Sequence, residues 1–201
     1  SLDDEEEYSI DVIQPEKIEF KQNSYEDGEN SIISFPEFLL LVLDVCTGGE
    51  QPASHYQPDK LIEKFDALKT YFTAGEFYEK MLYYRLLLDY YTIRKDIKDG
   101  QGNYSLILKG PKDDSDKLKQ YQSMLYVSTE AFYNWLKPYL RKLEQDELHS
   151  CVEMLAFLKK EDNERHSILP ARKDLSYKAS GNIRYWFWRL DYYLWEQRST
   201  F

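Results

Sequence analysis

Apolar and aromatic side chains recur at intervals of three and four residues along most of this 201-residue chain. That spacing places side chains on one face of an α-helix and favours a mainly α-helical chain. Residues 36–46 are apolar nearly all round, which predicts a helix at the centre of the core. Ser34 can cap this helix, Pro36 suits its first turn, and Gly48 and Gly49 end it. Further helices are predicted to begin near Asp59 and after residues 128–131, and to cover about residues 76–97, 116–127, 148–159 and 182–197.

Composition favours a folded and mainly α-helical protein. Aromatic residues make up 16% of the chain, whereas disordered chains are poor in them. Glycine accounts for only 8 of 201 residues, and all-β proteins need many glycine-containing turns. We therefore expect an irregular multi-helix bundle with room for one short β-hairpin. A short strand is predicted over residues 104–108, after a turn at residues 98–102.

The first 30 residues differ from the rest of the chain. They begin with an acidic run at residues 3–7 and contain few large aliphatic side chains. Residues 8–12 and 17–20 alternate apolar with polar side chains, as in a short exposed strand. We interpret residues 1–30 as an acidic linker or edge segment with one weak hairpin, and residues 31–201 as one helical domain. The acidic run is read as a solvated segment, with mimicry of nucleic acid as the alternative.

The chain begins with Ser1 instead of Met and ends at Phe201 directly after a strongly predicted helix. From these two features we expect a fragment of a longer polypeptide.

The predicted helices imply specific inward faces. In the helix after Asp59, one face carries Leu61, Ile62, Phe65 and Leu68. The helix over residues 76–97 has a stripe formed by Phe77, Met81, Tyr84, Leu88 and Tyr91. Over residues 148–159 the inward residues are Val152, Leu155 and Leu158, and a polar loop is expected over residues 161–182.

Charge and cysteine usage limit the compartment and the partners. The net charge is −10, so the chain as a whole is repelled by nucleic-acid phosphates unless its basic residues gather on one face. Cys46 and Cys151 each lie in an apolar helical stretch and are read as buried free thiols. The longest apolar run, residues 38–45, is too short to cross a bilayer. We expect a soluble, cytoplasmic protein with no membrane partner.

No arrangement of residues typical of an active site is found. His55, His149 and His166 lack a second histidine or cysteine at zinc-ligand spacing. Residues 161–166 cluster ligand-type side chains beside basic ones and are read as a solvated loop. Phosphate-binding glycine loops and nucleophile motifs are missing too. We therefore predict no catalytic residue, no metal site and no cofactor.

The last predicted helix carries the most informative residues. Ile183, Phe187, Leu190 and Leu194 recur at helical spacing and are expected to face the core. A second face combines aromatic rings with charged groups. Packing within the fold is the favoured interpretation of that face, docking of a partner or domain is the second, and base stacking is the third. The candidate docking face consists of Arg184, Trp188, Asp191, Tyr192 and Trp195.

Several segments resemble the middle helical section of GmrSD-type, modification-dependent (Type IV) restriction endonucleases and their relatives. The matching segments are Ser34-Phe35-Pro36-Glu37-Phe38-Leu39-Leu40, Asp59-Lys60-Leu61-Ile62-Glu63-Lys64-Phe65, Tyr91-Thr92-Ile93-Arg94-Lys95 and, most distinctively, residues 184–195. In that family the section links an N-terminal ParB/sulfiredoxin-like nucleotide-hydrolysing domain to a C-terminal HNH-type nuclease domain. The resemblance implies a non-catalytic helical spacer whose partners are the flanking domains of the parent chain, in a prokaryotic phage-defence protein. The family's catalytic residues have no counterpart in this sequence. Asp99-Gly100-Gln101 is followed by Gly102 instead of the Arg of the N-terminal domain's motif, and no nuclease histidine follows residues 184–195 before Phe201.

Two alternatives stay open, and the sequence does not indicate an oligomeric state. A stand-alone protein-interaction domain is one of them. A module that contacts DNA is the other, and it requires basic residues to converge on one surface, namely Arg85, Arg94, Lys95, Lys98, Arg184 and Arg189.

Overall fold

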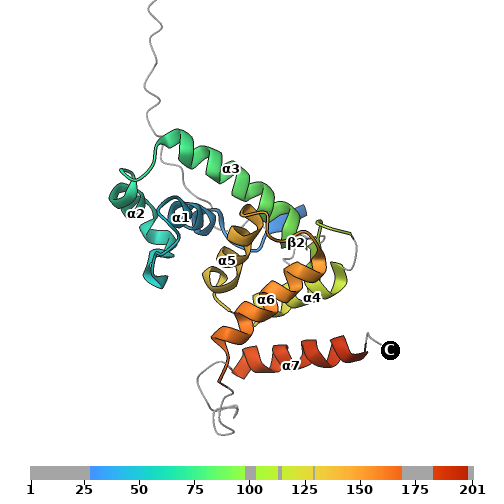
Figure 1. The fold of residues 1–201 in the computed structure, drawn as a ribbon. Coiled ribbons are helices and arrows are strands. Elements are labelled where there is room, and N and C mark those ends of the chain that lie inside the picture. The colour runs from blue at the N-terminus through green and yellow to red at the C-terminus, as the bar shows by residue number, and fades with distance from the viewer. Residues whose placement is uncertain (1–27, 98–102, 113–114, 129, 169–182, 199–201) are drawn as a thin grey trace, which may run out of the picture.

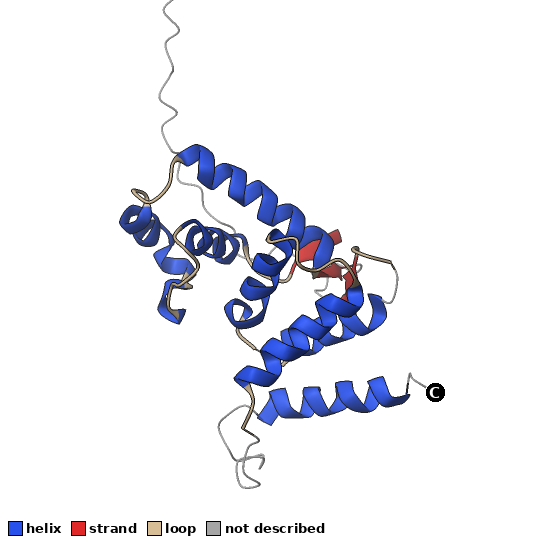
Figure 2. Cartoon of the chain, viewed as in Figure 1, coloured by secondary structure: helices blue, strands red, loops and turns tan. Residues whose placement is uncertain are grey.

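The fold is mainly α-helical with one small antiparallel sheet, as predicted (Figures 1 and 2). The computed structural model describes residues 28–97, 103–112, 115–128, 130–168 and 183–198. The predicted alternation within residues 8–20, the turn at residues 98–102 and most of the loop after residue 168 lie outside the described residues. The elements are, in order, β1 (Gly28–Ser31), α1 (Phe35–Cys46), η1 (Ala53–His55), η2 (Pro58–Lys60), α2 (Leu61–Leu68), α3 (Ala74–Tyr91), β2 (Ile93–Ile97), β3 (Tyr104–Leu108), α4 (Ser115–Val127), α5 (Phe132–Glu144), α6 (Cys151–Arg165) and α7 (Ile183–Arg198).

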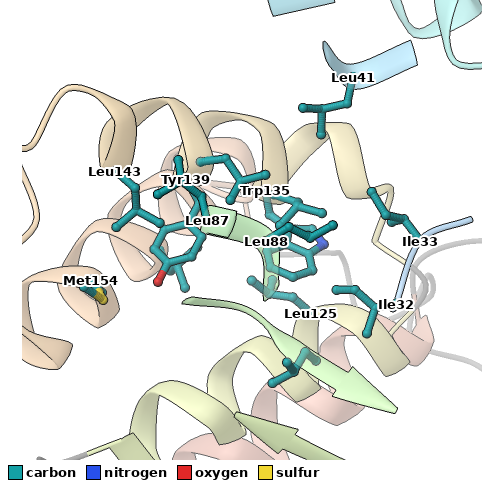
Figure 3. Close-up of a cluster of buried hydrophobic side chains, with 14 of the residues drawn as sticks. Ile32, Ile33, Leu41, Leu87, Leu88, Leu125, Trp135, Tyr139, Leu143 and Met154 are labelled. Carbon is teal, nitrogen blue, oxygen red and sulfur yellow. The ribbon is translucent and has the colours of Figure 1, made fainter. Parts of the chain in front are cut away.

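Helix α1 lies in the core, as its apolar sequence predicts. Phe38, Leu40, Leu41, Val42 and Leu43 are all buried. The core continues through side chains of α3, α4, α5 and α6, part of which Figure 3 shows. Further buried members include Tyr84, Leu88, Leu118, Tyr121, Leu125, Trp135, Tyr139, Leu140 and Leu158.

Helix starts follow local sequence where a capping side chain is present. Ser34 accepts a hydrogen bond from the backbone N–H of Glu37 and caps α1, as predicted. Thr73 and Ser150 form the same reciprocal capping arrangement at α3 and α6. The predicted cap at Asp59 is wrong, because residues Pro58–Lys60 form a 3-10 turn and α2 begins only at Leu61. Ile62, predicted to face inward from this helix, is exposed.

The predicted helix over residues 76–97 ends early, and its last residues form a strand instead. Helix α3 stops at Tyr91, and Ile93–Ile97 form β2, the central strand of the sheet β1-β2-β3. Both neighbours are antiparallel, with Gly28 opposite Ile97 and Ile93 opposite Leu108. The predicted strand over residues 104–108 is β3.

A buried glutamine explains where α3 ends. The Gln122 side chain on α4 accepts from the N–H of Ile93 at 2.9 Å and donates to the carbonyl of Tyr91 at 3.0 Å. The hydroxyl of Tyr139 on α5 donates to the same carbonyl at 3.2 Å. These side chains satisfy backbone groups that the next helical turn would otherwise use. The helix therefore ends through contacts made by residues far along the chain.

Helix α6 is longer than predicted. It extends to Arg165, so residues 161–165, predicted as loop, are helical. Its inward face is formed by Cys151, Met154, Leu158 and Asp162, whereas Val152, predicted to be inward, is exposed. Both cysteines are free, and Cys151 is buried, but Cys46 is only partly buried.

Gly110, which follows β3, provides a test of the packing between the sheet and α3. A Cβ atom at this position would collide with the backbone carbonyl oxygen of Tyr90. We expect Gly110→Ala to lower the free energy of unfolding by about 1–3 kcal/mol, because backbone on both sides must move. At Gly75, in the first turn of α3, a Cβ atom would meet only the hydroxyl oxygen of Thr73 at an ordinary contact distance of 3.9 Å, so Gly75→Ala should raise stability by about 0.4–1 kcal/mol. Urea denaturation of both variants measures the two effects, and equal stability of the two would contradict this packing.

Candidate functional site

Helix α7 presents a different face to the core from the one predicted. It lies at one end of the molecule and packs against α4 (Figure 1). Tyr185 and Tyr192 are its buried residues. The prediction that Ile183, Phe187, Leu190 and Leu194 form the core face is wrong: Phe187 is 46%, Leu190 53% and Leu194 47% exposed. The inward face is made of tyrosines and charged groups.

A buried carboxylate explains this orientation. Asp162 on α6 has no exposed surface. Its oxygens accept hydrogen bonds from Tyr121 on α4 at 2.7 Å and from Tyr185 on α7 at 2.8 Å. The guanidinium of Arg189 lies 3.8 Å away and also donates to the Tyr185 hydroxyl at 2.7 Å. A buried carboxylate needs such donors, and a purely aliphatic face of α7 would supply none.

His166 lies at the edge of this cluster. Its ring stacks on that of Tyr185 at 4.0 Å, and its Nε2 is 3.5 Å from a carboxylate oxygen of Glu130 and 3.9 Å from one of Asp162. The interpretation of residues 161–166 as a solvated loop is therefore wrong, because Asp162 and His166 belong to a polar network between α4, α6 and α7. The described residues contain no group of three or more histidine, cysteine or acidic side chains placed to hold a metal ion. Since Asp162 has no accessible surface, the network is suited to holding helices together.

A second contact joins α6 to the C-terminal half of α7. Lys159 donates to both carboxylate oxygens of Glu196 at 2.7 and 2.8 Å. Its ammonium group also lies over the rings of Tyr121, Tyr192 and Tyr193 at 5.3–5.9 Å. Tyr192 donates to Glu196 at 3.0 Å. Thus the inner side of α7 is held by cations, carboxylates and aromatic rings together.

Another buried acid holds the N-terminal half of the fold. Asp44 on α1 is fully buried and pairs with Lys137 of α5 at 2.9 Å. It also accepts from the Tyr56 hydroxyl and from the backbone N–H of Gln51. The local sequence around Asp44 does not reveal this role, because its partners Tyr56 and Lys137 lie elsewhere in the chain.

Four of the five predicted docking residues line one groove on the surface. We call it the α4–α7 groove. It has a volume of about 270 Å³ and is lined by Gln120, Ser123, Met124 and Val127 of α4 and by Trp188, Asp191, Tyr192 and Trp195 of α7. Tyr192 forms its floor at 4% exposure, while Trp188 is 41% exposed. Arg184 is exposed but does not line the groove.

Sequence spacing alone brought the α7 residues of this groove together, since residues 188, 191, 192 and 195 share one helical face. The α4 residues were missed. Nothing local marks them, because only the packing of α7 on α4 brings them to the same place.

The basic residues considered for DNA contact are distributed over different parts of the fold. Arg85 and Arg94 both pair with Asp89, at 2.8 and 3.5 Å. Lys95 lies over the rings of Tyr104 and Tyr126. Arg189 is on α7, at the end of the molecule opposite α3 (Figure 1). Lys98 lies outside the described residues.

The Asp162 network gives a stability prediction. Asp162→Ala leaves two tyrosine hydroxyls without their acceptor and removes the buried carboxylate that pairs with Arg189, so we expect the free energy of unfolding to fall by about 3–5 kcal/mol. Glu164, two residues later, is exposed and has only a 3.9 Å pair with Lys160. Glu164→Ala should therefore change stability by less than about 0.5 kcal/mol. Thermal and chemical denaturation compare the two variants, and similar losses in both would show that Asp162 does not hold α7 in place.

Buried tyrosines give a prediction for alkaline pH. Burial is the main cause that raises the pKa of six tyrosine hydroxyls well above the ordinary value of about 10: Tyr56, Tyr84, Tyr121, Tyr139, Tyr185 and Tyr192. Above about pH 10 the unfolded chain loses these protons while the folded chain keeps them. Stability is therefore fully retained below that pH and falls as the pH rises above it.

We expect part of the tyrosinate absorbance to appear in one cooperative step together with loss of helical circular dichroism. Smooth ionisation of every tyrosine with the helical signal intact would contradict the burial of these hydroxyls.

None of the described helices is long and apolar enough to cross a membrane. Comparison of the chain with protein-family models, with curated proteins and with solved structures finds no match.

Proposed function

We propose that this chain is a non-catalytic helical docking module that binds another protein domain through α7. The observation that carries the proposal is that α7 is apolar on the side that faces away from the fold. Phe187, Leu190 and Leu194, which we call the α7 outer face, recur at intervals of three and four residues and are each about half exposed. Helices that dock on a partner present anchors at this spacing.

The α7 outer face is continuous with further aromatic surface. Trp188 follows Phe187 directly and leads into the α4–α7 groove, where Trp195 is partly exposed. Contiguous apolar surface of this kind marks protein contacts, and tryptophan is enriched among the residues that dominate binding energy. In contrast, the polar network on the inner side of α7 already accounts for how the helix is held. On this side Leu190 and Leu194 are exposed and available to a partner.

The resemblance to the middle section of GmrSD-type enzymes suggests which partners to test first. They are a nucleotide-hydrolysing domain and an HNH-type nuclease domain of the same polypeptide, between which this module would act as a spacer. That assignment stays a prediction. Contact with DNA is the alternative, and the ion pairs of Arg85 and Arg94 with Asp89 make these residues less available for phosphates.

Site-specific photo-crosslinking tests the docking role. Benzoylphenylalanine replaces Leu190 in one variant and Lys160, an exposed residue of α6, in a matched control, and the complete encoded polypeptide is expressed in its native cells. We expect Leu190 to crosslink to one recurrent polypeptide segment, and Phe187→Ser with Leu194→Ser to remove that crosslink. These two serine substitutions should change the melting temperature little, because the side chains are half exposed.

The same experiment separates the alternatives. Equal crosslinking from Leu190 and Lys160, or a crosslink that survives the serine substitutions, would overturn the proposal. A crosslinked pair of identical chains, with a dimer in sedimentation velocity, would identify self-association in place of docking. Binding of duplex DNA at low salt that falls steeply with added salt would favour the DNA alternative.

A further inference from the structure

The α4–α7 groove combines aromatic rings with a single charged side chain. Asp191 is the only charged residue in its lining. Asp191 is exposed, and within the described residues it has neither a hydrogen bond nor an ion pair. The rest of the lining is neutral, with polar groups from Gln120 and Ser123 and apolar or aromatic surface elsewhere. Its electrostatic character is therefore negative.

The rings flank the carboxylate along the helix. Trp188 precedes Asp191 by three residues and Trp195 follows it by four, which places all three on one face of α7. At a rise of about 1.5 Å per residue, the two tryptophans are about 4.5 Å and 6 Å from Asp191 along the axis. A cation at Asp191 would thus have an indole ring on either side, with Tyr192 and Met124 beneath it.

The inner side of the same helix shows what such an arrangement binds. There an arginine of the chain, Arg189, pairs with the carboxylate of Asp162 and lies against three aromatic rings, those of Tyr185, Trp186 and Tyr193. The guanidinium of Arg189 lies 5.3–5.9 Å from these three ring centroids and 3.8 Å from Asp162. The fold therefore fills its internal aromatic and acidic site with an arginine, whereas the site around Asp191 has no cation from this chain among the described residues.

We propose that the α4–α7 groove receives an arginine side chain from the docked partner protein. This inference rests on the proposed docking function and specifies the chemistry of the partner. A planar guanidinium stacks on tryptophan and can bind a carboxylate through two parallel hydrogen bonds, which an ammonium group cannot do. The net charge of −10 attracts a basic segment over longer distances.

The size of the groove also fits a side chain. At about 270 Å³ it lies below the range of roughly 300–1,000 Å³ common for sites that enclose small-molecule ligands. Its location next to the α7 outer face allows one partner segment to place apolar anchors on Phe187 and Leu190 while its arginine enters the groove. The partner's contact segment is therefore expected to combine leucine-like residues with arginine.

Peptides provide the probe. We would titrate the whole chain with acetyl-Leu-Arg-Leu-amide and with matched peptides carrying lysine, norleucine or glutamate at the centre, and follow the indole N–H resonances of Trp188 and Trp195. The arginine peptide should bind most tightly, lysine more weakly, and glutamate least. We expect Asp191→Asn and Trp188→Leu each to weaken the arginine peptide by about three- to tenfold and to leave the norleucine peptide unchanged.

Glu164→Gln removes an exposed negative charge from α6, outside the groove, and serves as the matched control. It should change binding of the arginine peptide less than twofold, and none of these variants should alter the melting temperature appreciably, because the replaced side chains are exposed. Equal affinity for arginine and norleucine peptides, or equal effects of Asp191→Asn and Glu164→Gln, would overturn the inference.

Failure of this inference is distinguishable from failure of the docking role. If docking is correct and the arginine site is wrong, Leu190 still crosslinks to its partner and Asp191→Asn leaves that crosslink unchanged. If the docking role is wrong, Leu190 gives no specific crosslink even when the arginine peptide binds.

Discussion

The carboxylate of Asp162, buried where α4, α6 and α7 meet, decides how the C-terminal part of the fold packs. A buried charge without donors is strongly unfavourable, so the surrounding helices must supply hydrogen bonds. Tyr121 supplies one from α4 and Tyr185 another from α7. This requirement sets the rotation of α7 about its own axis. Once Tyr185 and Arg189 face inward, Phe187, Leu190 and Leu194 necessarily face outward.

The functional proposals follow from that rotation. A helix held by tyrosines and charged groups on its inner side leaves its aliphatic and tryptophan-bearing sides available to a partner. Both sides of α7 pair aromatic rings with a carboxylate, and on the inner side an arginine of the chain itself occupies the arrangement. We propose that the outer arrangement, around Asp191, binds an arginine of another protein through the same chemistry. The stability of this helix and the recognition proposed for it thus involve the same kind of contact.

Polar side chains reaching across the fold also shape the N-terminal half. Gln122 satisfies the backbone at the junction of α3 and β2, and Asp44 links α1 to Lys137 of α5. Each of these residues lies within an otherwise apolar helical face. Buried polar side chains of this kind specify where a helix ends or which helix it contacts, because hydrogen bonds are directional. Burial of apolar surface is less directional and does not specify these features alone.

Local sequence was enough to predict the helical class, the central position of α1, the capping at Ser34, the strand Tyr104–Leu108 and the common face of Trp188, Asp191, Tyr192 and Trp195. These features depend on residues within one or two helical turns, where spacing and capping rules apply. Long-range packing, in contrast, ends α3 at Tyr91, buries Asp162 and leaves Phe187, Leu190 and Leu194 exposed. The reason is that these outcomes depend on hydrogen-bond partners far apart in the chain, 29 residues for Ile93 with Gln122 and 41 for Tyr121 with Asp162. An apolar stripe shows that burial of that helix face is favourable, but the packing of the whole fold determines whether the core or a partner covers it.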